Sequence, residues 1–558
     1  MPPQNDPGPS HPCVKPKTHK PAYTKLEFSY LDIPADNTST SSGVKITAGE
    51  PIFVNPNSHS SVIKVLREIG HQTNITKYVK GGCREWVAIT CDGLPFSIAH
   101  RVLKETYTCP TCHTAIFTRK NYISHVKDHE EYTNTSEDDL PFDLEFDWTI
   151  LRIGHGHFEM NMVRSFFKLN WDVCIKELAK CMGFCCENAQ KYAKSGGDHH
   201  KAWEFLQILY LGCIDELILP YVRECLQKDL VSTPDGFLRW TRDIKSHRYQ
   251  YLQEQMLTYA SAIIHLRRGI RQNDMALVLA GRVKYAPIFY SRNHPKYQQI
   301  ELTELSNFLT APTALQDFLK TYQAISISGD PERCEDMDFV LEAINKKSKS
   351  WAPRGVPTHK EWQQIFRNLQ KFDELRSAVF SRMRRDDPDA EKSYTSSHVA
   401  RDEEVTAWRT CLRGSNFLDN PFTSDAPFTS VSAEKLDPEL VHLTNQAVKR
   451  RRYLARKMFG VAQEDDSVEP SQVFVTEAER AQHNDIINQR KETIATRVLT
   501  AINALDDAGI KTLLLAEWEM SVKNKKREDY IAFFFRVEVE VAQQAQVTGL
   551  ALADGDKQ

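Results

Sequence analysis

The chain has 558 residues, of which 41% are hydrophobic and 26% are charged, and its formal net charge is −3. This composition is typical of a soluble protein with roughly two to four domains. Thirteen cysteines are too few and odd in number for a disulfide scaffold. The longest apolar run, at 531–535, is too short to cross a bilayer. We therefore expect an intracellular protein with no membrane partner and no small-molecule cofactor.

The N-terminal part predicts a tail followed by a short helix and a buried strand. Residues 1–45 are rich in Pro, Ser, Thr and Asn and predict a disordered tail. The segment 61–70 has a helical apolar stripe, and 84–90 is a β-branched apolar run. That run ends at Asp92, which is followed by Gly-Leu-Pro, so we expect a strand that delivers a carboxylate to a sharp turn. A core domain is expected over 46–380.

Between these elements and the next strand lies a pattern of two cysteines and two histidines. Cys109 and Cys112 are separated by two residues, His125 follows after twelve, and His129 after three more. This is the ligand spacing of a Cys2His2 zinc finger, which we place at 103–132. Aromatic and aliphatic residues stand at the positions where such a finger builds its small core, namely Tyr107, Ile116 and Tyr122. The pattern predicts a structural Zn²⁺ held by Cys109, Cys112, His125 and His129.

The role of this finger is left open by its neighbours. If its helix entered a DNA major groove, Lys120 and Asn121 would be among the residues facing the bases. A single finger covers only about three base pairs, however, and the acidic stretch after His129 would repel phosphate. A DNA contact, a protein contact and a purely structural role all remain open.

The remainder of the chain is predicted to be mostly helical. A second strand is expected at 148–153, a helix beginning near His157, and a large all-helical insertion over 160–330. Residues 384–440 carry many Asp, Ser, Pro and Thr and predict a linker. The last region, 441–558, is expected to be helical. It contains a basic cluster that fits a nuclear-import signal, a phosphate-binding patch or a solvated helix face: Lys449, Arg450, Arg451 and Arg452.

Four polar residues are candidates for catalysis: Asp92, His157, Glu159 and Glu342. Carboxylates are the ligands that Mg²⁺ prefers, so the acids could hold magnesium for phosphoryl transfer. The alternatives are ordinary ones: Asp92 as a turn or helix cap, His157 and Glu159 as satisfied polar groups at a helix start, and Glu342 on a solvated helix face. A second metal site made by Asp198, His199, His200 and the cysteines upstream fits no established spacing, and Asp198 is better explained as a helix N-cap.

Five stretches resemble an uncharacterised family of transposable-element character, known as domain of unknown function 6589. They are 80–96, 154–173 (GHGHFEMNMVRSFFKLNWDV), 198–206, 292–301 and 338–357 (DFVLEAINKKSKSWAPRGVP). The resemblance covers about 50–370. It implies an origin in a transposon but no established activity.

The order of elements is also similar, more distantly, to transposases of RNase H-like fold. That similarity implies a predominantly α-helical α/β fold with a mixed-sheet core, interrupted by the finger and the helical insertion. Asp92 would match the second acid of the Asp-Asp-Glu triad and Glu342 the third, with Mg²⁺ between them. No strand upstream carries a convincing first Asp. We therefore expect a catalytically degenerate, nuclear protein that binds nucleic acid or protein. The alternatives are an active metal-dependent transposase or nuclease and a non-enzymatic helical scaffold.

Overall fold

The computed structural model describes residues 58–291, 294–326, 332–351, 358–386, 402–424 and 427–459, with positions 52 and 54 and scattered positions between 480 and 518. The expected tail at 1–45, the beginning of the expected linker and most of the region beyond 459 lie outside the described residues. The chain forms two compact units. We call 155–336 with 377–476 the helical unit, and 45–154 with 337–376 and 477–558 the mixed unit.

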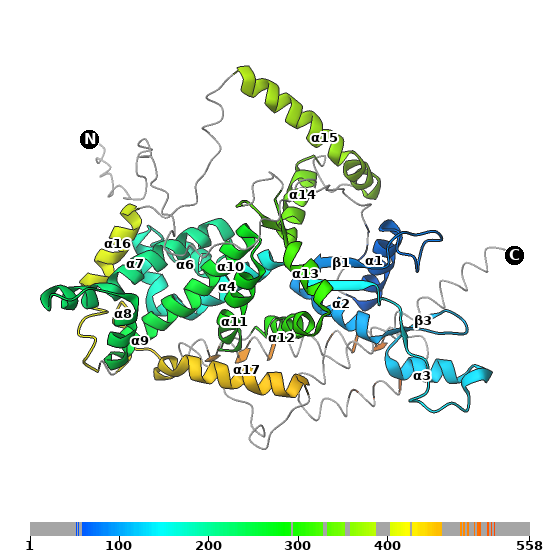
Figure 1. The fold of residues 1–558 in the computed structure, drawn as a ribbon, viewed down its shortest axis with the longest axis horizontal. Coiled ribbons are helices and arrows are strands. Elements are labelled where there is room, and N and C mark those ends of the chain that lie inside the picture. Colours follow the sequence, from blue (N-terminus) through cyan, green and yellow to red (C-terminus); the bar gives the residue numbers. More distant parts are fainter. Residues whose placement is uncertain are drawn as a thin grey trace, which may run out of the picture. The chain divides into compact units, whose positions relative to one another are not determined.

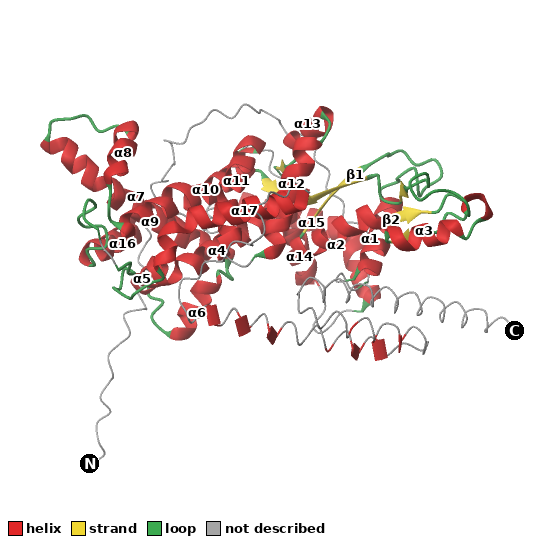
Figure 2. Ribbon diagram, turned by 90° about the horizontal axis from the view of Figure 1, so that it is seen from below, coloured by secondary structure: helices red, strands yellow, loops and turns green. Residues whose placement is uncertain are grey.

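Helices dominate the described residues, and the strands are few and short (Figure 2). The prediction of a predominantly helical α/β protein is therefore confirmed. The described strands form three small sheets with orders β1-β5, β3-β2-β4 and β6-β7. No RNase H-like sheet is identified among them, because the parallel sheet that contains β1 has only two described strands.

The mixed unit carries both the parallel strand pair and the finger (Figure 1). Its elements are α1 (His59–Gln72), β1 (Val87–Cys91), α2 (Gly93–Glu105), β2 (Thr106–Thr108), β3 (Ala115–Phe117), α3 (Arg119–Lys127), the 3₁₀ turn η2 (Glu130–Tyr132), β4 (Asp143–Leu144), β5 (Thr149–Ile153) and α14 (Met337–Trp351). The helix α15 (His359–Asp386) begins in this unit and ends in the other.

The two expected strands pair with each other in parallel. Val87 of β1 lies opposite Thr149 of β5, and Cys91 lies opposite Ile153. The chain between them carries α2 and the whole finger, so the finger is inserted within a parallel crossover. Beneath the strands α1 and α2 pack on a core that includes Leu66, Val102 and Trp148.

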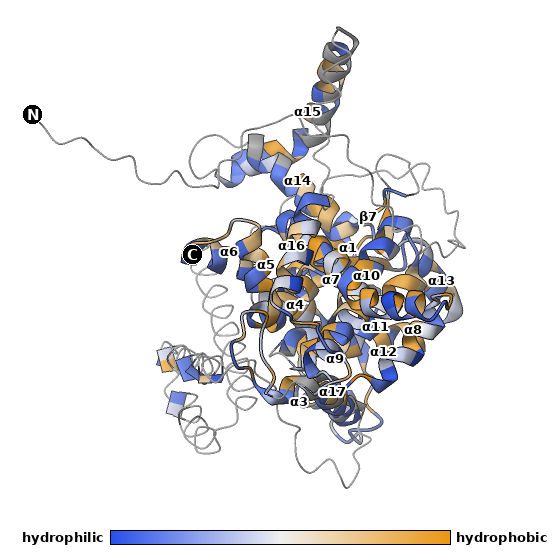
Figure 3. Ribbon diagram, turned by 90° about the vertical axis from the view of Figure 1, so that its left-hand side faces the viewer, coloured by the Kyte–Doolittle hydropathy of each residue, from blue (hydrophilic) through white to orange (hydrophobic). Residues whose placement is uncertain are grey.

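In the described residues, the helical unit is built from helices between His155 and Thr321, followed by two short strands, two later α-helices and a 3₁₀ turn. They are α4 (His155–Asn170), η3 (Trp171–Ile175), α5 (Lys176–Cys181), α6 (Glu187–Ser195), α7 (His199–Gln227), α8 (Pro234–Trp240), η4 (Thr241–Asp243), α9 (His247–Glu254), η5 (Gln255–Ala260), α10 (Ser261–Gln272), α11 (Met275–Ser291), α12 (Pro295–Thr310), α13 (Thr313–Thr321), β6 (Ala324–Ile325), β7 (Glu335–Asp336), α16 (Asp402–Gly414), η7 (Pro438–His442) and α17 (Leu443–Phe459). Hydrophilic and hydrophobic residues alternate around these helices (Figure 3), as packing against neighbouring helices requires.

The long helix α7 is the centre of this packing. It is long and apolar enough to cross a membrane, but 56% of its most apolar window is buried inside the protein. Leu206, Leu209 and Leu217 are fully buried, while Glu216 on the same helix binds two arginines. These features are those of the core helix of a globular unit.

Two π-helical turns, η3 and η5, interrupt the helices at the centre of the unit. Asn170, which precedes η3, is fully buried. Its Nδ2 donates to Gln255 Oε1 of η5 at 3.0 Å, and its Oδ1 accepts from the Tyr251 hydroxyl at 3.0 Å. The two turns are thus held to each other by buried hydrogen bonds, although Gln255 Nε2 is buried without a hydrogen-bond partner among the described residues.

The segment that we expected as a linker contains an ordered helix. In α16, Trp408 is completely buried against α7. A Cβ atom on Gly212 would lie 2.6 Å from Trp408 Cδ1, so glycine is required where the indole crosses α7. Arg409 and Arg413 bind Glu216 at 2.8 and 2.7 Å. The buried residues Val405, Trp408 and Leu412 stand at helical spacing, so this helix is visible in the local pattern but not in the polar composition of 384–440 as a whole.

Candidate zinc centre

The two cysteines of the finger lie on the tight connection between β2 and β3. The Cys109 N–H donates to the Thr114 carbonyl at 2.9 Å, and the His113 N–H donates back to the Cys109 carbonyl at 3.0 Å. His113 has a left-handed backbone, with φ of 57°, which allows the chain to reverse. This turn brings both thiols to one side of the hairpin.

The two histidines come from α3 and the turn that continues it. Thr118 caps the helix, and its hydroxyl accepts from the Asn121 N–H. His125 lies in the last turn of α3, and His129 lies two residues past its end, where the His129 N–H still donates to the Val126 carbonyl at 3.1 Å. Both rings therefore face the hairpin, as the three-residue spacing predicted.

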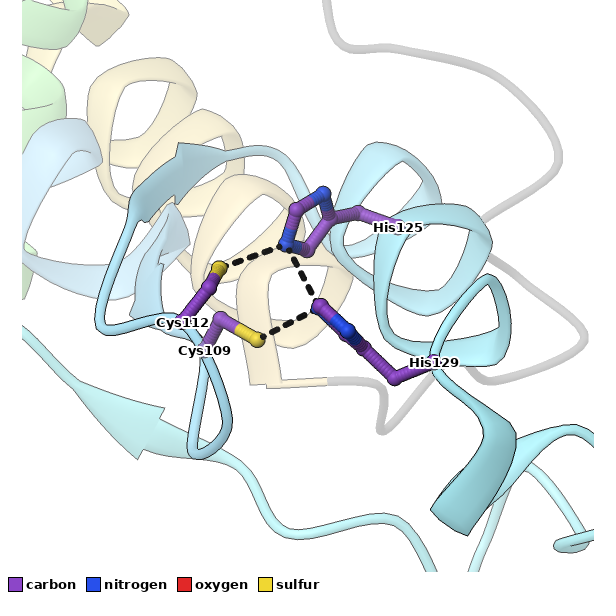
Figure 4. A group of neighbouring side chains, drawn as sticks. All are labelled: Cys109, Cys112, His125 and His129. Atoms are coloured by element: carbon purple, nitrogen blue, oxygen red, sulfur yellow. Dashed lines mark hydrogen bonds between the residues drawn. The ribbon is translucent and has the colours of Figure 1, made fainter.

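The four side chains converge on one point (Figure 4). Cys112 Sγ lies 3.1 Å from His125 Nε2, Cys109 Sγ lies 3.4 Å from His129 Nε2, and the two Nε2 atoms are 3.3 Å apart. A tetrahedral zinc ion with Zn–S bonds of about 2.3 Å and Zn–N bonds of about 2.05 Å holds its ligand atoms roughly 3.3 to 3.8 Å apart. Two of the three distances lie in this range, the distance from Cys112 to His125 is slightly shorter, and all four ligand atoms lie within 4.8 Å of one another, so the group can hold zinc. Four protein ligands leave no coordination position for a substrate.

The electrostatics of the site favour the ligand form of cysteine. Hydrogen bonds with Thr114, together with those of His125 and Cys109, lower the pKa of Cys112 to about 5. The thiolate is the form that binds metal. Cys109 is buried and Cys112 is exposed, so the site is open to solvent on one side.

The finger core confirms the expected residues and adds a segment that the spacing pattern does not include. Tyr122 is fully buried, and its ring packs against that of Tyr107 in a tilted arrangement with 5.0 Å between ring centroids. The chain beyond the second histidine then returns: β4 pairs with β2, and Phe142 packs 5.3 Å from the Tyr122 ring. Leu140 is also buried in this cluster. The Leu-Pro-Phe run at 140–142 was the available sequence signal for this closure.

The outer face of α3 carries the residues that we considered for DNA contact. Lys120 and Asn121 are both exposed, and Asn121 Nδ2 donates to the Phe117 carbonyl at 3.3 Å. The other basic residues are engaged within the finger: Arg119 lies 4.8 Å above the Phe142 ring, and Lys127 pairs with Glu137 at 3.9 Å. From 106 to 144 there are three basic and seven acidic residues, so the finger as a whole is acidic.

The two acids proposed as catalytic in the mixed unit are exposed. Asp92 is the N-cap of α2, where its carboxylate accepts from the Gly93 N–H. This is the helix-capping role that the sequence offered as the alternative to magnesium binding. Glu342 lies on α14. The more buried acids of this segment are Asp336, which accepts from the His155 N–H at 2.6 Å, and Asp338, which lies against Gly154. Within the described ranges, the four finger ligands are the group of three or more His, Cys, Asp or Glu side chains that lie close enough to hold a metal ion. Asp92 and Glu342 belong to no such group there.

Glu159 is held in a buried ion cluster of the helical unit. Its Oε1 lies 3.0 Å from Arg267 Nη1 and 3.2 Å from His199 Nε2. Burial alone would raise the pKa of Glu159, but Arg267 and His199 outweigh it and hold the pKa below its usual value. Arg267 also lies 4.2 Å above the Trp203 ring. This arrangement is that of a paired structural carboxylate.

The other candidate residues near the starts of α4 and α7 also take part in hydrogen bonds. The His157 carbonyl accepts from Asn161 Nδ2 at 2.7 Å. Asp198 caps α7 by accepting from the Lys201 N–H at 3.1 Å, as expected. In the described residues the upstream cysteines do not join His199 or His200 in a metal-binding group.

The basic cluster on α17 is divided between an ion pair and solvent. Arg451 binds Glu301 of α12 through two contacts of 2.6 and 3.3 Å, and the Tyr290 hydroxyl donates to the same carboxylate at 3.1 Å. Lys449 and Arg452 are exposed, whereas Arg450 is half-buried. Arg451 is thus engaged in holding α17 to the helical unit.

A scan against models of protein families, a search of curated proteins and a search of solved structures each found no match to this chain.

Proposed function

We propose that this protein is a non-enzymatic, predominantly helical scaffold whose single zinc finger is a structural module that contacts protein. The observation that carries this proposal is the closed set of four ligands inside a finger whose surface is acidic. A closed zinc site stabilises a fold and offers no position for catalysis.

The charge of the finger favours protein over DNA as its partner. Seven acidic residues between 106 and 144 oppose the phosphate backbone, which supplies most of the affinity of DNA-binding modules. Lys127 is paired with Glu137, and Arg119 lies over the Phe142 ring although it is exposed like Lys120. Two exposed bases give too little phosphate contact to hold a single finger on DNA.

The transposon origin belongs to the same proposal. The five stretches that resemble domain of unknown function 6589 suggest it, although no family model matches the chain, and the parallel pair β1-β5 with Asp92 at its end is consistent with it. We infer that catalysis has been lost, because Asp92 serves as a helix cap and Glu342 is exposed away from any described group of metal ligands. A nuclear location, with Lys449 and Arg452 as the exposed part of an import signal, completes this proposal.

The test compares the full-length protein with Cys112→Ser and a matched variant, Cys83→Ser, which changes an exposed cysteine outside the finger. We expect one zinc per chain in the wild type and in Cys83→Ser, and its loss in Cys112→Ser. In cells, crosslinks from Lys120 to other proteins should disappear with the zinc.

Two further measurements address the alternatives. Fluorescence anisotropy with double-stranded DNA at low salt should show no zinc-dependent binding. A DNA cleavage assay with Mg²⁺ or Mn²⁺ should show no activity in the wild type. Zinc-dependent DNA binding that Lys120→Ala weakens would overturn the protein-contact role, and cleavage that Asp92→Ala abolishes would restore the enzyme hypothesis.

A further inference from the structure

The strand β1 has an open edge. It belongs to a sheet with two described strands, in which β5 is its neighbour on one side. A parallel pair uses every second residue of each strand for its hydrogen bonds. In β1 these residues are Val87, Ile89 and Cys91, since the Val87 N–H and the Cys91 carbonyl both bond residues that flank β5. Ala88 and Thr90 therefore direct their backbone N–H and C=O groups to the opposite side, where the described residues provide no strand.

Both faces of β1 carry contacts, so the edge is the side that is left open. Val87 and Ile89 pack on the apolar cluster beneath the strands, to which α1 and α2 contribute. The Thr90 hydroxyl donates to Met337 Sδ of α14 at 3.8 Å. Because side chains stand off the faces of a sheet, this contact involves a face of the sheet and not its edge. All residues of β1 nevertheless remain partly exposed.

The sequence of β1 lacks the features that protect natural edge strands. Such strands carry charges, prolines or bulges that prevent pairing with another chain. The run Val-Ala-Ile-Thr-Cys at 87–91 has neither a charge nor a proline, and its register with β5 is continuous. It is typical of an interior strand of a parallel sheet. The side chains at its two ends are also exposed, Trp86 by 44% and Leu94 by 36%. An edge of this kind favours association with another extended backbone.

A second copy of β1 fits this edge because the edge is complementary to itself. A two-fold axis through Ile89, perpendicular to the sheet, would place Ala88 of each copy opposite Thr90 of the other. Each of these pairs would exchange both of its N–H···O=C bonds, as antiparallel neighbours do, so that every outward group of the two residues is satisfied. The same axis brings the Trp86 end of one strand to the Leu94 end of the other, so both exposed apolar ends gain cover.

We propose that the protein self-associates through β1, so that two copies form one continuous sheet with the order β5-β1-β1-β5. The central pair of this sheet is antiparallel, and the two outer pairs keep their parallel register. The proposal goes beyond the role of the finger, because it rests on the strand pair and not on the zinc site. Self-association would give the scaffold two copies of each of its other surfaces, and thereby raise its avidity for a partner with repeated sites.

The register is tested by a disulfide that only two chains can form. In the proposed pair, residue 87 of one copy lies opposite Cys91 of the other at a position without ladder hydrogen bonds, where side chains approach most closely. Within one chain the two positions are about 13 Å apart along the strand, which is beyond the reach of a disulfide. We expect mild oxidation of zinc-loaded, full-length Val87→Cys to link residue 87 of one chain to Cys91 of another.

Peptide mapping identifies this link without ambiguity. Trypsin places both positions in the peptide 85–101. Because each chain contains this peptide once, two copies linked to each other can come only from two chains. We expect the linked copies in Val87→Cys and their disappearance after treatment with dithiothreitol. The wild type and Val87→Cys/Cys91→Ser are the matched controls and should show no linked copies, because each lacks one of the two facing thiols.

Sedimentation equilibrium measures the association itself. At tens of micromolar we expect the full-length wild type to have twice the chain mass of 64.1 kDa. Ala88→Pro removes an outward N–H and places a ring at the pairing edge, a position at which an edge strand tolerates proline, and it should sediment at the mass of one chain. Ala88→Ser keeps the N–H and should remain a dimer. Circular dichroism checks that Ala88→Pro is folded, and the disulfide carries the test if it is not.

Three results would each overturn the proposal. They are a wild type that sediments as a monomer, a folded Ala88→Pro that remains a dimer, and an oxidised Val87→Cys without linked copies of 85–101. The first result would leave the edge of β1 to an extended segment of another protein, and the second would move self-association to another surface.

Discussion

The finger and the helical unit are stabilised in opposite ways. The finger spans about forty residues, buries few side chains completely and brings four metal ligands to one point. The helical unit buries dozens of apolar residues and ties its helices together with buried ion clusters at Glu159, Glu216 and Glu301. A small element depends on its metal, whereas a large one depends on packing and on charges that must remain paired.

Removal of zinc should distinguish the finger from the helical unit most clearly. Structural zinc contributes on the order of 10 kcal/mol to the folding of an isolated finger. We expect a chelator to abolish the hydrogen-exchange protection of α3 and to leave that of α7 unchanged. Equal loss of protection in α3 and α7 would mean that the helical unit depends on the metal as well.

Breaking the cluster at Glu159 should destabilise the helical unit alone. Arg267→Met leaves a buried carboxylate without its strongest partner, which costs roughly 3 to 5 kcal/mol. Chemical unfolding followed by circular dichroism measures the change. The control is Lys191→Met, which removes an ion pair to the exposed Glu187 of α6 and should leave the unfolding midpoint unchanged. Equal losses of stability in the two variants would show that burial does not determine how much each ion pair contributes.

The helix α16 should depend on one aromatic side chain. Trp408→Ala removes a completely buried indole and should cost about 3 to 5 kcal/mol, with α16 losing exchange protection first. Phe422→Ala, which changes a partly exposed aromatic residue beyond the same helix, is the matched control. Retained protection of α16 in Trp408→Ala would shift the anchoring role to Arg409 and Arg413.

The smallest expected effect is a pH dependence within the helical unit. Burial raises the pKa of Glu254 to about 7, from an ordinary value of 4.5. The folded state therefore favours the protonated acid, so this contribution is complete below about pH 4.5 and is lost as pH rises through 7. Glu254→Gln should match the wild type at pH 4 and be more stable by up to about 3 kcal/mol above pH 7. A stability difference that is the same at both pH values would exclude this ionisation as its cause.

How much the sequence predicts differs between the two regions for a physical reason. The finger ligands lie within 21 residues, and their spacing alone identifies the site. The strands β1 and β5 and the helix α17 were likewise readable from local patterns. By contrast, Glu159 and Arg267 are 108 positions apart, and Arg451 and Glu301 are 150 apart. Local periodicity carries no information on such partners, so the ion pairs of Glu159 and Arg451 could not be predicted from the sequence.

The π-helical turn η5 has a consequence for how this unit tolerates insertions and deletions. It admits an extra residue between α9 and α10, so the residues that follow are rotated relative to those of an uninterrupted α-helix. Each residue advances a helix by about 100°. A one-residue deletion within 255–260 would therefore be absorbed by closure of the π turn to α-helix, whereas a one-residue deletion within 261–266 would turn Arg267 away from Glu159. The number of residues between η5 and Arg267 therefore matters as much as their identity, because it sets the direction in which Arg267 leaves α10.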